Sequence, residues 1–447
     1  MGGGSLITKA RALAVGDGIP DIDGLLGEGL DCACGKRHAC GIDQVLIYSD
    51  ALNELPALTA DFHRITLVCD KNTYRVCGRR VKELLADKVK ECLIYEDGAN
   101  GFVVPNEDAV ARLEGCVYEK TDLIIGVGSG VINDLCKYVS FAHGLPYFIV
   151  ATAPSMDGYA SKGAAMIFNG MKVTTNADVP RVIIADTAVL KEAPLSMLKA
   201  GYGDMIGKYS CLNDWRLGAL VNGEYFCEFV YELTFKTVEV ISKMGRAILS
   251  RDEASIATLM RGLVIVGIAM AYVGNSRPAS GSEHHLSHYF EIVGLLRDEP
   301  YFCHGIDVAY STYETARLRR ALLYIKSPEG KPFDIAEWEA AIYRVYGTEK
   351  NTDTAQQIIK LQKKIGWIYE DRLSLYKEKW EEIREILASS PTPERVGEML
   401  GSVDLPLDDF ERMYTREKRS DAIRYAKDLK DRYSVLWLYE QVLREKQ

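Results

Sequence analysis

Four of the seven histidines lie in one short segment, between residues 284 and 304. His284 and His288 are four positions apart in GSEHHLSH, so on a helix they would share one face. His304 follows in the tripeptide CHG. Imidazole is a common metal ligand, and a catalytic metal usually takes three protein ligands and keeps one position open. The spacing predicts a metal site held by His284 and His304, which needs a third ligand from elsewhere in the chain.

Asp204 is the candidate for that third ligand. It follows AGYG, between glycines and the start of a predicted helix rather than on a charged helix face. A carboxylate and two imidazoles are a donor set that suits a divalent cation. The alternative is that the histidines are scattered polar residues and that Asp204 only caps a helix.

A glycine-rich turn follows the apolar run at residues 123–127. The segment DLIIGVGSGVIND reads as a strand, a turn and a helix start. Glycines let the backbone approach a pyrophosphate, and a helix N-terminus offers free N–H groups. Gly126, Gly128 and Gly130 fall at every second position, so this is not the GxGxxG dinucleotide motif. The segment indicates a phosphate-binding turn, with a purely structural tight turn as the alternative.

Two more polar segments follow apolar runs. Asp70 ends the run ITLVC, where a carboxylate can accept hydrogen bonds from ribose hydroxyls; the alternative is a helix cap. The segment TAPSMDGYAS, residues 152–161, follows YFIVA. Ligands of open α/β sheets bind beyond the carboxyl ends of the strands, so this segment is a second candidate for cofactor or substrate contacts. An ordinary polar turn is the alternative there.

The segment CACGKRHAC, residues 32–40, places three thiols and an imidazole within nine positions. Such a set could hold a structural zinc ion. The CxC spacing is short, however, and no matching CxxC pair lies downstream. We therefore favour a plain hairpin or loop, with a structural zinc site and a redox pair as alternatives.

The elements that must position these residues change character near residue 190. Before it, continuous apolar runs predict strands buried on both faces, at residues 65–69, 93–95, 123–127, 147–151 and 181–185. Helix candidates alternate with them near residues 73–86, 106–115 and 131–142. This alternation predicts an α/β fold with a doubly wound parallel sheet, a nucleotide-binding domain over residues 1–190.

After residue 190 the strand signals fade. Long helical patterns cover residues 196–219, 223–250, 252–273, 303–326, 335–346, 353–388 and 417–445. Thr392-Pro393-Glu394 is a typical helix start, and residues 327–330 form a loop pattern. We expect an all-helical domain over residues 191–447, which binds metal and substrate.

Composition sets the broad class. The chain has 447 residues, 47% of them hydrophobic and 26% charged, which is ordinary for a globular protein of two or three domains. The net charge of −9 disfavours general binding to nucleic acid or anionic membranes. We find no run of about 20 apolar residues and no secretory N-terminus. With eleven cysteines, these features predict a reducing compartment, the cytoplasm.

Five motifs occur in a fixed order: GSGVIND followed by Lys137, ATAPSMDGYAS, AGYGDMIGKYSCLNDW, SRPASGSEHHLSH and CHGIDV. In order and spacing they resemble the sn-glycerol-1-phosphate dehydrogenase family, and most closely its bacterial branch. This family belongs to the iron-containing alcohol dehydrogenase, glycerol dehydrogenase and dehydroquinate synthase-like superfamily. The resemblance runs from about residue 40 to the end. It implies a nucleotide-binding α/β domain, a helical domain, and an active site in the cleft between them.

The resemblance also implies roles for single residues. Asp204, His284 and His304 match the metal ligands of the family. Asp157 and His288 match catalytic positions that contact substrate, and Asp204 counts with them because it would touch substrate as well as metal. Residues that match the binding positions for NAD or NADP are Asp70, Gly130, Val131, Ile132, Asn133, Asp134, Thr152, Ala153, Pro154, Ser155 and Ser161.

The implied reaction is the reversible reduction of dihydroxyacetone phosphate to sn-glycerol 1-phosphate by NADH or NADPH. A divalent metal, zinc or nickel, would act as a Lewis acid at the carbonyl oxygen. His288 is a candidate proton relay or a plain hydrogen-bond donor to substrate. Arg277 is a candidate for the phosphate contact, with a structural ion pair as the alternative. Asp70 would favour NADH, because a carboxylate repels a 2′-phosphate.

Three other functions stay open. A glycerol or polyol dehydrogenase would lack the phosphate site. A dehydroquinate synthase-like lyase would use the same metal and nucleotide, but an aspartate at position 204 and the block SRPASGSEH argue against it. A catalytically inactive nucleotide-binding scaffold would have no need of three metal ligands. The expected partner is a small phosphorylated substrate, and the long helical region could provide the interface of a homodimer.

Overall fold

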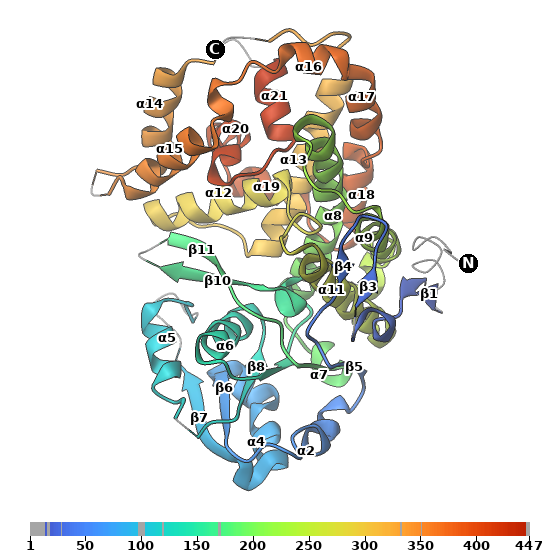
Figure 1. The fold of residues 1–447 in the computed structure, drawn as a ribbon, viewed down its shortest axis with the longest axis vertical. Helices are drawn as coiled ribbons and strands as arrows, with labels where there is room; N and C mark the ends of the chain where they lie inside the picture. Colours follow the sequence, from blue (N-terminus) through green and yellow to red (C-terminus); the bar gives the residue numbers. More distant parts are fainter. Residues whose placement is uncertain are drawn as a thin grey trace. The chain divides into compact units, whose positions relative to one another are not determined.

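The computed structural model describes residues 14–15, 18–27, 29–96, 103–118, 120–168, 171–330, 333–349 and 351–443 (Figure 1). The chain divides into two compact units. The first unit contains the residues up to Met205 together with residues 228–276, and the second contains residues 206–227 and those from Arg277 onward.

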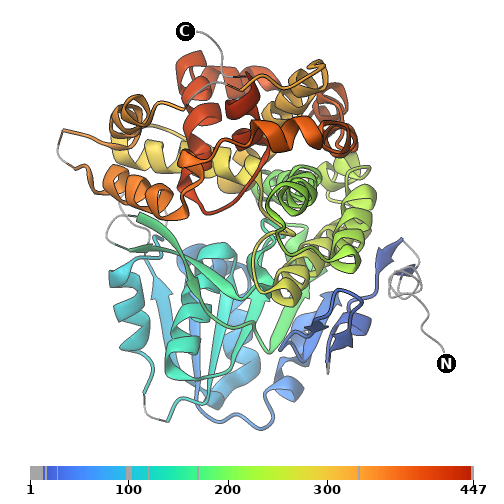
Figure 2. The ribbon, with the colours of Figure 1, turned by 45° about the horizontal axis from the view of Figure 1, so that its top comes forward.

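The first unit is built on a six-stranded sheet, whose strands are seen side by side in Figure 2. The strand order is β5-β12-β9-β8-β6-β7, and every neighbouring pair is parallel. The strands are β5 (Gln44–Tyr48), β6 (Ile65–Asp70), β7 (Val89–Tyr95), β8 (Leu123–Gly128), β9 (Tyr147–Ala151) and β12 (Val182–Asp186). Strands β8, β9 and β12 are buried along their whole length, which explains their unbroken apolar runs. The predicted parallel α/β fold is confirmed.

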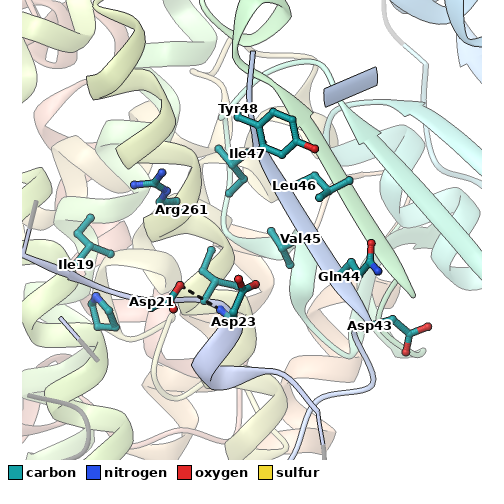
Figure 3. A pocket seen from close by; sticks show the side chains of 12 residues that line it. Ile19, Asp21, Asp23, Asp43, Gln44, Val45, Leu46, Ile47, Tyr48 and Arg261 are labelled. Carbon is teal, nitrogen blue, oxygen red and sulfur yellow. Dashed lines mark hydrogen bonds between the residues drawn. The ribbon is translucent and has the colours of Figure 1, made fainter. Parts of the chain in front are cut away.

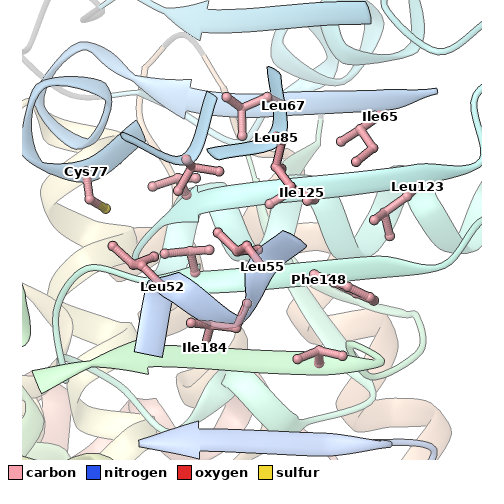
Figure 4. Packing of buried hydrophobic residues seen from close by; sticks show 14 of the residues in the cluster. Leu52, Leu55, Ile65, Leu67, Cys77, Leu85, Leu123, Ile125, Phe148 and Ile184 are labelled. Atoms are coloured by element: carbon pink, nitrogen blue, oxygen red, sulfur yellow. The ribbon is translucent and has the colours of Figure 1, made fainter. Parts of the chain in front are cut away.

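Helices cover both faces of this sheet. One face packs against η2 (Ala51–Glu54), α2 (Leu55–Leu58) and α4 (Arg79–Leu85), and Leu52, Leu55 and Leu85 meet Leu67 and Ile125 there (Figure 4). The opposite face packs against α6 (Gly130–His143), since Cys136 of that helix faces Gly126 of β8. The remaining elements between the strands are α3 (Lys71–Thr73), η3 (Tyr74–Gly78), η4 (Ala86–Lys88) and α5 (Glu107–Glu114).

Short hairpins and turns surround the sheet. Strands β3 (Leu30–Asp31) and β4 (Arg37–His38) form one antiparallel hairpin, and β10 (Gly163–Phe168) and β11 (Met171–Asn176) form another. A third antiparallel pair joins β1 (Ala14–Val15) to β2 (Ile19–Pro20). Three helical turns complete the region, namely η1 (Asp23–Leu25), η5 (Gly158–Ala160) and α7 (Thr187–Leu190).

Three helices of the first unit come from residues 228–276. They are α9 (Glu228–Ile241), α10 (Gly245–Leu249) and α11 (Glu253–Val273). The single helix predicted over 223–250 is therefore broken before α10. By length and composition α11 could cross a membrane, although we expected no such run from the sequence, but 89% of its apolar window is buried inside the protein. Such burial is typical of a core helix.

All regular secondary structure in the described residues of the second unit is helical. Helix α8 (Leu195–Asn222) enters it from the first unit without a break. The other elements are α12 (Ser282–Arg297), α13 (His304–Leu323), α14 (Ile335–Tyr346), α15 (Asp353–Ile365), η6 (Trp367–Tyr369), α16 (Leu373–Glu378), α17 (Trp380–Ala388), α18 (Pro393–Ser402), α19 (Leu407–Met413), α20 (Arg416–Tyr425), η7 (Ala426–Leu429) and α21 (Val435–Leu443).

Most helix predictions are confirmed in this unit, and the errors have local causes. The hydroxyl of Thr392 caps α18 by accepting from the N–H of Arg395 at 3.3 Å, as the sequence predicts. The helix predicted over 353–388 ends instead at Gly366, whose φ of +89° is the left-handed conformation that stops a helix. The helix predicted over 417–445 is likewise divided into α20, η7 and α21.

The change in sequence pattern near residue 190 marks the point where strands give way to helices. Strand β12 is the last strand of the described residues, and α8 begins at Leu195. The two compact units divide the chain differently, because α9, α10 and α11 pack with the first unit. The predicted boundary at residue 190 separates the part of the chain that contains strands from the part that contains only helices, among the described residues. As a boundary between domains, it stays a prediction.

Candidate active site

Three of the clustered histidines come together in the second unit. His284 and His288 lie one turn apart on α12, and His304 is the first residue of α13. The ring centroid of His304 lies 5.1 Å from that of His284 and 5.5 Å from that of His288. The His284 and His288 centroids are 6.1 Å apart, so the predicted shared helix face is confirmed.

Neighbouring polar groups orient two of these rings. The Nδ1 atom of His284 lies 2.6 Å from Oε1 of Glu283, which is fully buried. Burial acts to raise the pKa of Glu283, but its hydrogen bond to His284 and the charge of that ring outweigh this effect, and the pKa is lowered. The Nδ1 atom of His304 lies 3.3 Å from the hydroxyl of Ser287. Both rings are held at Nδ1, and a histidine held in this way usually binds a metal through Nε2.

Asp204 lies on α8. This residue belongs to the first unit, and the part of α8 that belongs to the second unit begins at Ile206. The carboxylate of Asp204 is fully buried and accepts from the backbone N–H of Asp157 at 3.0 Å. We call Asp204, His284 and His304 the Asp–His group. Their potential ligand atoms all lie within 4.8 Å of one another. The donor set fits a divalent cation, because a buried carboxylate beside two imidazoles needs a positive charge to offset its desolvation.

The residues predicted to hold the cofactor gather at the carboxyl ends of the strands. Gly128 at the end of β8 pairs with Ala151 at the end of β9, and the N–H of Thr152 donates to the carbonyl of Gly128 at 3.1 Å. The hydroxyls of Ser129 and Ser155 are 2.5 Å apart. The glycine turn and the TAPS segment therefore form one continuous surface at the N-terminus of α6.

The three glycines of this turn differ in whether packing requires the absence of a side chain. A Cβ on Gly126 would lie 2.9 Å from Sγ of Cys136, and one on Gly128 would lie 2.6 Å from Cβ of Ile132. Both positions therefore need glycine because α6 packs so closely on β8. A Cβ on Gly130 would meet nothing nearer than Cγ of Met156 at 3.6 Å. Protein packing does not require glycine at the first residue of α6.

Asp70 lies at the end of β6, in the same sheet as the glycine turn. One of its carboxylate oxygens accepts from the N–H of Thr73 at 2.8 Å, and the hydroxyl of Thr73 accepts from the N–H of Asp70. This reciprocal pair is a capping box on α3. The capping alternative for Asp70 is confirmed, and its contact with a ribose stays a prediction.

Lys137, part of the GSGVIND motif region but given no role by the sequence, is fully buried beneath these loops. Its ammonium donates to the carbonyls of Gly158 and Gly163 and to the hydroxyl of Ser161. Burial lowers the pKa of Lys137 to about 8, and the nearby Asp134 and Asp157 act to raise it. Ser161 accepts a hydrogen bond from Lys137, so its hydroxyl helps to hold the loop after β9 in place.

Two further residues have partners within the protein. Asp134 accepts from the N–H of Ala165 at 3.2 Å, which ties α6 to β10. The guanidinium of Arg277 is buried in an ion pair with Glu224, with Nε 2.7 Å from a carboxylate oxygen. The ion-pair alternative for Arg277 is therefore confirmed. Sequence reasoning missed Glu283 and Ser287, although both stand within the SRPASGSEHHLSH motif.

A separate cavity lies along the edge strand β5 of the first unit (Figure 3). It has a volume of about 810 Å³, and Arg261 of α11 and the acidic residues Asp21 and Asp23 face it. Its lining contains none of the residues predicted for metal, cofactor or substrate. We therefore assign it no part in the chemistry.

Residues 46–194 match the family model described as iron-containing alcohol dehydrogenase. A solved archaeal alcohol dehydrogenase from a Red Sea brine pool shares the fold with a TM-score of 0.56, at 14% identity, over 87% of this chain and 91% of that chain. The parallel sheet followed by helices is the fold of an alcohol dehydrogenase of this kind.

Relatives of known name indicate which dehydrogenase family the chain belongs to. A glycerol-1-phosphate dehydrogenase [NAD(P)+] from Geobacillus thermodenitrificans is 31% identical over 391 residues, which cover 86% of this chain and 88% of that one. Another from Halalkalibacterium halodurans is 36% identical over 288 residues, 63% of this chain and 72% of that one. The chain belongs to the glycerol-1-phosphate dehydrogenase family. The resemblance seen in its motifs is confirmed, and so is its class as an oxidoreductase.

Proposed function

We propose that this protein interconverts dihydroxyacetone phosphate and sn-glycerol 1-phosphate with NAD(P)H and one divalent metal ion. The observation that carries the proposal is the Asp–His group, in a chain whose named relatives are glycerol-1-phosphate dehydrogenases. Three ligands leave a coordination position for the substrate, as in catalytic metal sites.

The proposed ligands are the carboxylate of Asp204 and the Nε2 atoms of His284 and His304. When bound, the ion supplies Lewis-acid stabilisation of the oxygen on which negative charge develops. Glu283 and Ser287 hold the two rings at Nδ1, so that the ligand atoms are preorganised. Zinc and nickel both suit a carboxylate and imidazoles, and we propose one of these two.

The cofactor would bind at the N-terminus of α6. Its phosphates would lie against Gly130 to Asp134, where the first N–H groups of the helix and the helix dipole favour anions. Gly130 supports this role, because neither packing nor a positive φ explains its lack of a side chain. Residues Thr152 to Ser155 would form the adjoining wall, with Ser161 and Lys137 supporting it from below. The reduced nicotinamide supplies the hydride.

His288 is proposed to deliver the proton that the product alcohol needs. It is half-buried beside His304, and an imidazole can exchange protons near neutral pH. Asp157 would contact substrate, because the hydrogen bond from its backbone N–H to Asp204 places it beside a proposed metal ligand. A chain with these roles would need no further catalytic group for the reduction.

The test compares substrates. The purified protein is assayed by loss of NADH absorbance with dihydroxyacetone phosphate, with dihydroxyacetone and with glyceraldehyde 3-phosphate. We expect kcat/KM to be at least about 100-fold higher for dihydroxyacetone phosphate than for dihydroxyacetone, because a phosphate contact contributes on the order of 3 kcal/mol. Equal values for the two would favour a polyol dehydrogenase, and activity with neither would refute the proposal.

A further inference from the structure

A second set of possible metal ligands surrounds the β3–β4 hairpin of the first unit. We call Cys32, Cys34, His38 and Cys227 the Cys–His group. Their potential ligand atoms, three sulfurs and one nitrogen, all lie within 4.8 Å of one another. None of the four has a part in the proposed reduction. The first three stand together in the sequence, whereas Cys227 lies far away along the chain and completes the set only in the fold.

The hairpin presents its two thiols by means of a tight turn. Leu30 pairs with His38, and the N–H of Cys32 donates to the carbonyl of Lys36 at 3.0 Å. The N–H of Gly35 donates back to the carbonyl of Cys32, and Gly35 has a φ of +84°, which favours glycine. The turn brings Cys34 back over the strand, so that its sulfur lies 3.4 Å from Nε2 of His38.

His38 is oriented as metal-bound histidines are. Its Nδ1 atom lies 3.0 Å from the backbone carbonyl of Tyr272, which fixes the proton on that nitrogen. The lone pair is then on Nε2, the atom that faces Cys34. The ring is fully buried and stacks on Tyr272 and Phe229, with centroids 5.3 and 6.2 Å away. The neutral imidazole is the form that binds metal.

Cys227 comes from a different part of the sequence. It is fully buried and directly precedes Glu228, the first residue of α9. Phe229, in the first turn of α9, is one of the two rings that stack on His38. The same contact therefore fixes the imidazole and the helix start that carries the fourth ligand.

We propose that the Cys–His group binds one structural zinc ion, which fastens the β3–β4 hairpin to the start of α9. Three thiolates and one imidazole fill a tetrahedron, so no position stays open for a substrate. On binding, each of the three thiols releases its proton to solvent, and neither the metal nor the sulfur changes oxidation state. Lys36, whose charge acts on His38, would offset the net negative charge of the filled site.

A redox pair or a plain hairpin would account for fewer of these contacts. A redox pair of Cys32 and Cys34 would not require His38 or Cys227 to approach them. A plain hairpin, which the sequence favoured, explains β3 and β4 but not the convergence of a buried imidazole and a distant buried thiol. Strands of only two residues contribute few ladder hydrogen bonds, so a bound ion would add stability that this hairpin lacks.

The test uses cobalt(II) as a spectroscopic probe in the full-length protein. The protein is stripped with chelator under reducing conditions and titrated with cobalt(II). We expect a thiolate-to-cobalt charge-transfer absorption in the near ultraviolet that saturates by two added equivalents, because the Asp–His group can take up the other cobalt ion. The Asp–His group contains no sulfur and cannot produce this band. Zinc added afterwards should abolish it.

Variants show which residues produce the charge-transfer absorption. Cys227→Ser should remove most of it, and so should Cys34→Ser, whose half-buried position on the hairpin makes misfolding a smaller risk. Cys116→Ser, a half-buried thiol outside the group, is the matched control and should keep the full band. Asp204→Ala combined with His284→Ala should keep it as well, although the proposed catalytic site is then lost.

Two results would overturn the proposal. One is a wild-type protein that binds cobalt without any charge-transfer band. The other is a band of unchanged intensity in both Cys227→Ser and Cys34→Ser. A thiol titration that finds Cys32 and Cys34 joined as a disulfide in freshly isolated protein would support the redox alternative instead.

Discussion

The Asp–His group and the Cys–His group are both compact sets of metal ligands, but they differ in the number and kind of donor atoms. The first offers one oxygen and two nitrogens, which leaves a coordination position vacant. The second offers three sulfurs and one nitrogen, which complete a tetrahedron. Open oxygen and nitrogen sites are typical of catalysis, and closed sulfur-rich sites are typical of structural zinc. The two groups should therefore respond in opposite ways to the same perturbations.

The groups also differ in what surrounds them. A carboxylate, Glu283, and a hydroxyl, Ser287, orient the histidines of the Asp–His group. A backbone carbonyl and two aromatic rings hold the histidine of the Cys–His group. Hydrogen-bonding partners of metal-bound histidines tune the metal, and an apolar shell limits the access of solvent to it. Chemistry is expected at the first group and stability at the second.

The largest effect is expected at the Asp–His group itself. Asp204→Ala and His284→Ala should each abolish reduction of dihydroxyacetone phosphate, because two ligands hold a catalytic ion poorly. The melting temperature should stay within a few degrees of wild type. Steady-state kinetics and thermal denaturation measure the two quantities on the same samples. Near wild-type activity in either variant would refute the metal mechanism.

The converse pattern is expected for Cys227→Ser. It should lower the melting temperature by several degrees, because the hairpin loses its link to α9. The kcat at a temperature where the variant stays folded should remain within about twofold of wild type, since no ligand of the Asp–His group changes. Cys116→Ser should change neither quantity. Lost activity in a folded Cys227→Ser protein would show that the two groups are not separate in function.

A smaller effect is expected at Glu283. Glu283→Gln keeps the shape of the side chain but removes the charge that orients His284. Groups that hydrogen-bond to metal-bound histidines typically contribute about 10–100-fold to metal affinity or activity. We expect a loss in that range, with partial recovery when excess zinc or nickel is added. A metal dissociation constant equal to that of wild type would exclude this role for Glu283.

The smallest effect concerns the choice of cofactor. Replacing Asp70 by serine removes the carboxylate that would repel a 2′-phosphate, while a serine hydroxyl can still cap α3. The ratio of kcat/KM for NADH to that for NADPH should fall by about tenfold. An unchanged ratio would mean that the capping box with Thr73 is the whole role of Asp70.

Sequence reasoning succeeded where a pattern is local. The unbroken apolar runs of β6, β8 and β9 predicted a parallel sheet, since both faces of those strands are buried. It missed β5, an edge strand with exposed ends, because partial burial weakens the apolar pattern. It also missed the β10–β11 hairpin, because we read residues 152–161 only as a polar segment after β9 and expected no strand between them and β12.

The two metal-ligand groups show the same limit. His284, His288 and Asp204 were found because they stand in motifs with recognisable spacing. Cys227 has no motif around it, and only the fold brings it next to the hairpin. No spacing pairs it with Cys32 and Cys34, so the favoured interpretation was a plain loop. Glu283 and Ser287 were visible in a motif, but their contacts with ring nitrogens depend on side-chain geometry that spacing does not determine.

The most direct test of the proposed function is metal removal and return. The enzyme is stripped of metal with chelator, and its reductase rate with dihydroxyacetone phosphate and NADH is measured before and after zinc or nickel is added, alongside Asp204→Asn. We predict that wild-type activity is lost on stripping and returns with metal, that sn-glycerol 1-phosphate is the product by chiral analysis, and that the variant recovers nothing. A stripped enzyme that retains its rate, or a product of the opposite configuration, would contradict it.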